Sequence, residues 1–235
     1  MHDQKRFLDR RSAIREIVFG TQDGLLVPLG VTAGVAGATA QAGLILVAGL
    51  AEALAGTIAM GMGAYLASRA EQDLHQAAIS LELATIRRDP DHQRAELAGI
   101  FEAEGLSQLA AATMVEQLVS SPPAFARTLI EKKLGLALDH PETPVRDSLI
   151  VGASYLIGAA FPIVPYAVLN VSIAFPASLL LTLCALFGLG VLKGRMTRAR
   201  VVTSALEVTA AGVLSGIAGY ELGALFPHWI NLQGS

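Results

Sequence analysis

Four acidic residues lie inside stretches that are otherwise apolar enough to cross a membrane. An ion pair at the interface explains Glu207 and an acid at the headgroups explains Glu221, which leaves Asp23 and Glu52 as the main candidates. Asp23 lies in the segment FGTQDGLLVPLG, and Glu52 lies in AEALAGTIAMGMGAY. A charged side chain in the core of a bilayer costs about 2.5–3.5 kcal/mol on insertion scales, so a purely structural span has little reason to keep one. The two carboxylates therefore predict a pathway for a cation or a proton. For Asp23, which lies near the start of its stretch, an acid at the membrane interface is the alternative.

Met60 favours a metal ion as that cation. It follows Glu52 by eight residues, which on a helix places it about 80° around the axis and about 12 Å along it. The residues between them include several small ones, namely Ala55, Gly56 and Ala59. A carboxylate and a thioether together suit a borderline transition metal better than Na⁺ or Ca²⁺. Because methionine in an apolar helix more often only packs, this interpretation depends on Met60, Glu52 and Asp23 being taken together.

A second set of candidate ligands follows the second apolar stretch. It comprises five acids and one histidine: Glu71, His75, Glu82, Glu96, Glu102 and Glu104. The first three recur at i, i+4 and i+11, which places them within about 40° on one face of a helix. Carboxylates and imidazole on one face can bind a divalent transition metal. A helix face exposed to solvent explains the same spacing, so the spacing alone does not identify which of these residues bind metal.

The composition is that of a membrane protein. Hydrophobic residues make up 53% of the 235 residues and charged residues 16%, whereas soluble domains carry about 25% charged residues. The net charge of −3 gives no sign of a nucleic-acid partner. The single cysteine, Cys184, excludes an internal disulfide framework. Because neither a GxxxxGK[ST] loop nor an HExxH helix occurs, we do not expect an enzyme.

Five stretches reach the roughly 20 apolar residues that a bilayer requires; they cover residues 17–39, 43–66, 148–167, 171–192 and 201–226. All 17 Lys and Arg residues lie in or at the edge of segments 1–16, 67–147 and 193–200. Since basic residues mark the cytoplasmic side, the N-terminus is predicted inside and the C-terminus outside. The expected membrane is the inner or plasma membrane if the source is prokaryotic.

The predicted fold class is an all-α membrane protein with five transmembrane helices and a cytoplasmic helical domain inserted between the second and third. Its predicted parts are a basic cytoplasmic leader, two transmembrane helices, the cytoplasmic domain, three further transmembrane helices and a non-cytoplasmic tail, over residues 1–16, 17–66, 67–147, 148–226 and 227–235. Within the domain, the second transmembrane helix is expected to continue to residue 88 and to break at Asp89-Pro90. Three helices are predicted after that break, over residues 92–104, 107–119 and 123–138. Residues 72–147 hold twelve acidic and seven basic residues, a net charge of −5.

Two motifs carry a family resemblance. The first is Phe19-Gly20-x-x-Asp23-Gly24-Leu25 with Pro28 and Ala33-Gly34, and the second is Ala51-Glu52-x-x-Ala55-Gly56-x-x-x-Met60-x-x-Gly63-x-Tyr65. With the layout of the apolar stretches from about residue 15 to 226, they resemble the vacuolar iron transporter family. The resemblance implies a homodimer in the lipid bilayer, with no tightly bound cofactor. This dimer would move Fe²⁺, and often Mn²⁺, out of the cytosol in exchange for H⁺. It also implies a transport path along Asp23, Glu52 and Met60, and cytoplasmic metal ligands at Glu82 and Glu96.

The sequence departs from the family pattern at two places. Gly63-Ala64-Tyr65 stands where the family usually has Gly-Glu-Tyr, and Lys133 stands before Leu134 where the family tends to have glutamate. The resemblance therefore implies a reduced set of acidic ligands in the cytoplasmic domain. Two other functions fit the same residues, a membrane-anchored metal sensor or scaffold and a carrier of another divalent cation. A sensor would have no need of an acid in the middle of a span, as at Glu52.

Overall fold

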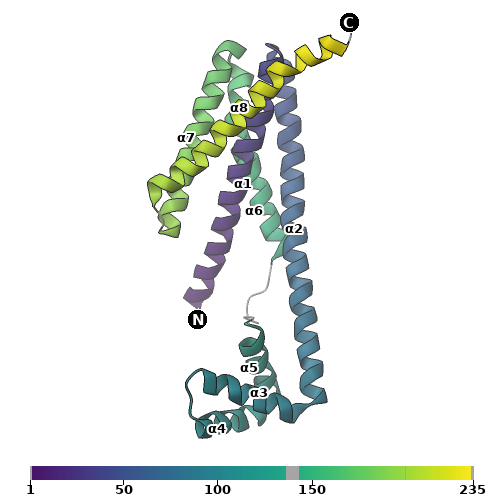
Figure 1. The fold of residues 1–235 in the computed structure, drawn as a ribbon, viewed down its shortest axis with the longest axis vertical. Coiled ribbons are helices and arrows are strands. Elements are labelled where there is room, and N and C mark those ends of the chain that lie inside the picture. The colour runs from purple at the N-terminus through teal and green to yellow at the C-terminus, as the bar shows by residue number, and fades with distance from the viewer. Residues whose placement is uncertain (1, 136–142, 199, 234–235) are drawn as a thin grey trace. The chain divides into compact units, whose positions relative to one another are not determined.

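The computed structural model is all-helical over the residues that it describes, which confirms the all-α part of the predicted class (Figure 1). It describes the backbone of residues 2–135, 143–198 and 200–233, and the side chains of residues 13–135, 143–198 and 200–225. In those ranges it has eight helices and no strand: α1 (His2–Ala38), α2 (Ala42–Arg88), α3 (Pro90–Ala103), α4 (Gln108–Val119), α5 (Pro122–Leu134), α6 (Pro144–Val168), α7 (Val171–Thr197) and α8 (Val201–Gln233).

The chain divides into two compact units. The first, here called the bundle, contains residues 1–65 and 144–235, and the second, here called the inserted domain, contains residues 66–143. Helix α2 contributes its first part to the bundle and its second part to the inserted domain. The break that follows it lies at Asp89-Pro90, as the sequence predicts, because proline cannot donate the next helical hydrogen bond.

Four helices are long and apolar enough to cross a membrane in the part of the chain that the structure describes. They are α2, α6, α7 and residues 201–225 of α8. Helix α1, the first of the five predicted spans, is not among them, and it carries the polar pair Gln22 and Asp23. The predicted leader 1–16 is helical from His2 and continuous with α1, and residues 227–233 of the predicted tail form the last turns of α8.

Helix α1 runs through the centre of the bundle. It packs against α6 and α8, while α7 packs against α8 (Figure 1). Leu25, Leu29 and Ala33 of α1 are at most 2% exposed. A Cβ atom on Gly223 of α8 would overlap the carbonyl oxygen of Gly34, so the two backbones meet where neither has a side chain. Such close approach is the usual way in which helices associate in membranes.

The inserted domain has its own apolar core between α3, α4 and α5. Its buried members are Leu97, Phe101, Ala111, Val115, Phe125 and Leu129. Ser107 caps α4 by accepting a hydrogen bond from the backbone N–H of Ala110, as expected for serine at this position. The helix predicted over residues 123–138 corresponds to α5, and its predicted end at residue 138 is wrong. Helix α5 stops at Leu134 because Gly135 adopts a left-handed conformation (φ 65°), and residues 136–138 lie outside the described part.

Candidate functional site

The first predicted carboxylate site centres on Glu52, in the apolar part of α2. Its side chain is half-buried, and its Oε1 accepts a hydrogen bond from the hydroxyl of Tyr155 on α6. Its other oxygen, Oε2, is buried and has no hydrogen-bond partner among the residues that the structure describes. A buried carboxylate oxygen with an unused lone pair is costly unless a proton or a cation satisfies it. Tyr155 thus fixes the Glu52 carboxylate through Oε1, and Oε2 is left to bind a proton or a cation.

Glycine at position 56 makes the contact between Tyr155 and Glu52 possible. Tyr155 is 2% exposed, and its ring lies against α2 one turn after Glu52. A Cβ atom on Gly56 would overlap both the ring and the hydroxyl of Tyr155. Residue 56 must therefore lack a side chain for the tyrosine to reach the carboxylate.

Asp23 lies on α1, which packs against α6 at Tyr155. It is half-buried and directly precedes Gly24, where a Cβ atom would overlap the backbone carbonyl of Tyr155. Pro28 lies four residues after Gly24 and removes the helical donor for the Gly24 carbonyl. Helices α1, α2 and α6 thus meet around Tyr155, with α1 against its backbone and α2 against its ring and hydroxyl.

Met60, the third predicted path residue, is half-buried on α2, two turns after Glu52. The next residue, Gly61, packs against α6: a Cβ atom there would lie 3.3 Å from the carbonyl oxygen of Ser148. Met60 is therefore on a stretch of α2 that follows α6, but about 12 Å along the helix from Glu52.

In the inserted domain, a lysine lies between two of the predicted metal ligands. The Lys133 ammonium of α5 donates to Oε1 of Glu82 (3.0 Å), Oε2 of Glu96 (2.8 Å) and, more weakly, Oε1 of Gln93 (3.4 Å). The hydrogen bond to Glu96, opposed by partial burial and helped by Glu82, raises the pKa of Lys133. The pKa of Lys133 is higher in the folded protein than its ordinary value of 10.5. The charge of Lys133 therefore stabilises the fold fully below pH 10.5, and this contribution is lost only as the pH rises above that value.

The other predicted ligands do not gather around this lysine. Glu71 and Glu102 are exposed, His75 is half-buried, and the exposed Glu104 pairs with Lys132 at 2.6 Å. Over the described residues, no three His, Cys, Asp or Glu side chains are grouped so that they could hold a metal ion. Of the six sequence-based candidates, the structure brings together Glu82 and Glu96, with a lysine between them.

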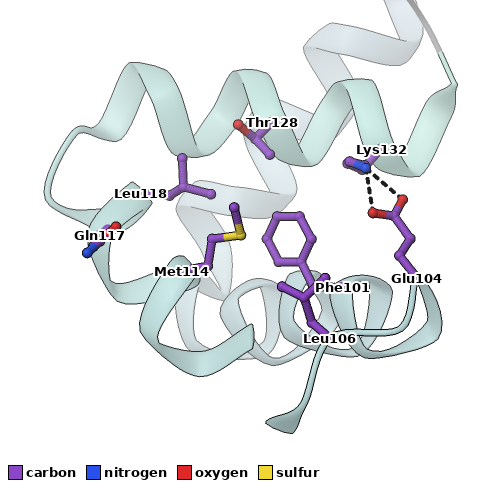
Figure 2. Close-up of a pocket in the computed structure, with 8 residues that line it drawn as sticks. All are labelled: Phe101, Glu104, Leu106, Met114, Gln117, Leu118, Thr128 and Lys132. Atoms are coloured by element: carbon purple, nitrogen blue, oxygen red, sulfur yellow. Dashed lines mark hydrogen bonds and ion pairs between the residues drawn. The ribbon is translucent and has the colours of Figure 1, made fainter. Parts of the chain in front are cut away.

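A pocket of about 490 Å³ lies between α3, α4 and α5 (Figure 2). Figure 2 shows Phe101, Met114 and Leu118 facing it, with the Lys132–Glu104 ion pair at one side. Lys132 also lies over the ring of Phe101, at 5.8 Å from its centroid. Half of the lining residues are apolar, and the one carboxylate among them is already paired with a lysine, so the cavity lacks the several carboxylate ligands that a divalent metal prefers.

Sequence reasoning missed Tyr155 as a site residue. The segment SYLIG has no motif that distinguishes a functional tyrosine from a packing one. The available signals are indirect: a tyrosine inside an apolar stretch and a glycine one turn after Glu52. Sequence reasoning also noted Lys133 as a departure from an acidic pattern, without the partners that the structure assigns to it.

Known proteins are similar to this chain over most of its length. A sequence profile of the VIT family matches residues 14–224. Vacuolar iron transporter 1 of Oryza sativa subsp. japonica is 34% identical over 222 residues, covering 94% of this chain and 88% of the rice protein. Vacuolar iron transporter 1 of Arabidopsis thaliana is 32% identical over 228 residues, covering 97% and 91%. Protein CCC1 of Saccharomyces cerevisiae is 26% identical over 226 residues, covering 94% and 69%.

Proposed function

This chain belongs to the VIT family, and on that premise we propose that it transports divalent iron across its membrane through a path on α1, α2 and α6. Family membership and the four apolar helices make it an integral membrane protein and a transporter rather than an enzyme. The observation that carries the proposal is the Glu52 carboxylate. It lies in a helix of membrane length, is fixed by Tyr155 through one oxygen, and keeps the other oxygen unpaired.

The proposed path uses Met60, Glu52 and Asp23 as successive contacts for the ion. The thioether and the carboxylates form a mixed donor set that suits Fe²⁺ and Mn²⁺. A proton and a metal ion compete for the same carboxylate oxygens, so binding of H⁺ from the far side promotes release of the metal. Exchange of H⁺ for metal also lowers the net charge moved, which matters at about 2.3 kcal/mol per charge per 100 mV.

We propose five spans, with α1 as the first and the inserted domain in the cytoplasm. Helix α1 is less apolar than the other four, but it packs against α6 and α8, so much of its surface faces protein rather than lipid. A helix shielded in this way tolerates Gln22 and Asp23 in a membrane. The net charge of −5 over residues 72–147 would then attract divalent cations to the cytoplasmic side.

A second copy of the chain is proposed to cover α2. On this helix the side next to Glu52 and Gly56 is exposed and carries Ala51, Ala55 and Ala59 at four-residue spacing. Small residues at that spacing favour helix–helix contact in a membrane, whereas large apolar residues suffice for contact with lipid. A dimer through this face would bring two Glu52–Met60 surfaces together and enclose the path.

The dimer predicts cross-linking at Ala55. In a chain in which Cys184 is replaced by Ser, the Ala55→Cys variant is expected to form a disulfide-linked dimer when oxidised in membranes. The control is Leu180→Cys in the same background, since Leu180 is an exposed residue of α7. The expected result is a dimer band on a non-reducing gel for residue 55 and little for residue 180. Equal cross-linking at both positions would mean random collision and would contradict an α2 interface.

Transport itself is tested with purified protein in liposomes that contain a metal-sensitive dye. We expect Fe²⁺, and also Mn²⁺, to enter faster than into protein-free liposomes, and the rate to increase with a pH gradient that is acidic inside. A folded protein that moves neither ion would overturn the proposal and leave the metal sensor as the better interpretation.

Tyr155→Phe is expected to lower the flux by about 10-fold or more, because a hydrogen bond to a charged group contributes roughly 1.5–3 kcal/mol and each ~1.4 kcal/mol corresponds to a factor of ten. The matched control is Tyr220→Phe on α8, where the tyrosine ring contacts Phe175 at a centroid distance of 5.2 Å. The control should transport like the wild type. If Tyr155→Phe also does, then Tyr155 does not position Glu52 for transport.

A further inference from the structure

The environment of the Lys133 ammonium is that of a bound cation. Its three nearest partners are oxygen atoms from two other helices, a carboxylate of α2 and a carboxylate and an amide of α3. The side chain of Glu82 is only 9% exposed, and the residue Gln93 only 1%. The oxygens thus line a site at the edge of the domain core, where α2, α3 and α5 meet.

Two carboxylates in this position need a positive charge between them. Burying Glu82 next to Glu96 without a counter-charge would place two like charges together in a partly dry environment, which is unfavourable. Lys133 supplies one positive charge and up to three donors, which match the three oxygens. The Lys133 ammonium, which belongs to the chain itself, therefore occupies the position that a free cation would otherwise take.

We propose that Lys133 is a built-in cation that closes the Glu82–Glu96 site to divalent metal ions, so that the inserted domain folds and holds together without bound metal. The proposal concerns residues 66–143 alone, and it stands whether or not the bundle transports iron. The acidic surface of the domain can still attract cations, but its two paired carboxylates do not chelate them.

The neighbouring residue Lys132 provides a matched control. It has the same side chain and the same helix, but it pairs with the single carboxylate of Glu104, and both partners are more than one-third exposed. Removing Lys132 frees one isolated carboxylate, which is too little for a metal site. Removing Lys133 frees two carboxylates beside the Gln93 amide, all of them oxygen ligands that Mn²⁺ accepts.

The first experiment measures Mn²⁺ binding to the full-length protein in detergent by electron paramagnetic resonance. Lys133→Met is expected to bind about one more Mn²⁺ per chain than the wild type, and Lys132→Met is expected to bind the same as the wild type. Adding Glu82→Gln to Lys133→Met should abolish the gain. Lys133→Gln serves as a second variant if Lys133→Met does not fold. No gain in the folded variant would overturn the proposal.

The second experiment needs no variant. Hydrogen exchange of the wild-type chain is compared in EDTA and in excess Mn²⁺, and the amides of residues 66–135 are followed. We expect their protection to be unchanged, because the lysine already satisfies the carboxylates. Increased protection around Glu82 and Glu96 on adding Mn²⁺ would show that metal displaces the lysine, and the proposal would then be wrong. Any Mn²⁺ effect confined to the bundle concerns the transport path instead.

Discussion

Glu52→Gln is expected to reduce Fe²⁺ flux by about 100-fold while leaving the folded protein intact. Glutamine keeps the shape of the side chain and an oxygen that can accept the Tyr155 hydrogen bond, but it loses the charge that attracts a cation. Removing one partner of a desolvated charge pair costs about 2–5 kcal/mol, and each ~1.4 kcal/mol corresponds to a factor of ten. The measurement is the initial rate of dye quenching in the liposome assay described above.

Two further substitutions sharpen this result. Asp23→Asn should also fail to transport, because the same ion passes the second carboxylate. Glu207→Gln is the control, since Glu207 is an exposed acid in α8, another apolar helix, and should transport like the wild type. Wild-type flux in Glu52→Gln would remove this carboxylate from the path, whatever the other variants do.

Gly24→Ala is expected to lower the stability of the bundle by about 1–3 kcal/mol or more, the range for overpacking a well-packed interior. The added Cβ atom would overlap the Tyr155 carbonyl, which is part of the α6 backbone and cannot rotate away. Helices α1 and α6 would have to separate at Tyr155, the residue that holds Glu52. The measurement is the thermal unfolding midpoint of the purified protein in detergent.

The control for this prediction is Gly188→Ala on α7. A Cβ atom at Gly188 meets nothing within 4 Å, so only the higher helix propensity of alanine acts there. That propensity is worth up to about 1 kcal/mol in favour of alanine, and the midpoint should stay equal or rise. Gly24→Ala is thus expected to lower the midpoint, and Gly188→Ala is not. A rise in both midpoints would show that α1 and α6 are not as close at Gly24 as the structure has them.

Local features of this protein could be predicted from its sequence because they depend on neighbouring residues. The continuous helix through residue 88 and its break at Asp89-Pro90 follow from the absence of glycine and proline between Ser68 and Arg88 and from the chemistry of proline after it. Ser107 caps α4 through its own side chain. Four of the five predicted spans meet the length and hydropathy of a membrane helix in the described residues, because both properties are carried by consecutive residues.

The tertiary structure alone decided which polar groups meet. Glu52 and Tyr155 are 103 residues apart in the chain, and Lys133 is 51 residues from Glu82 and 37 from Glu96. The sequence placed acids on a helix face, but it could not tell whether a metal ion or a lysine would lie between them. That choice depends on how helices pack. Packing in turn depends on where two backbones can approach closely, as at Gly24, and on where a side chain fits against a glycine, as at Gly56. How closely two helices approach depends on both of their surfaces, so it cannot be predicted from either stretch of sequence alone.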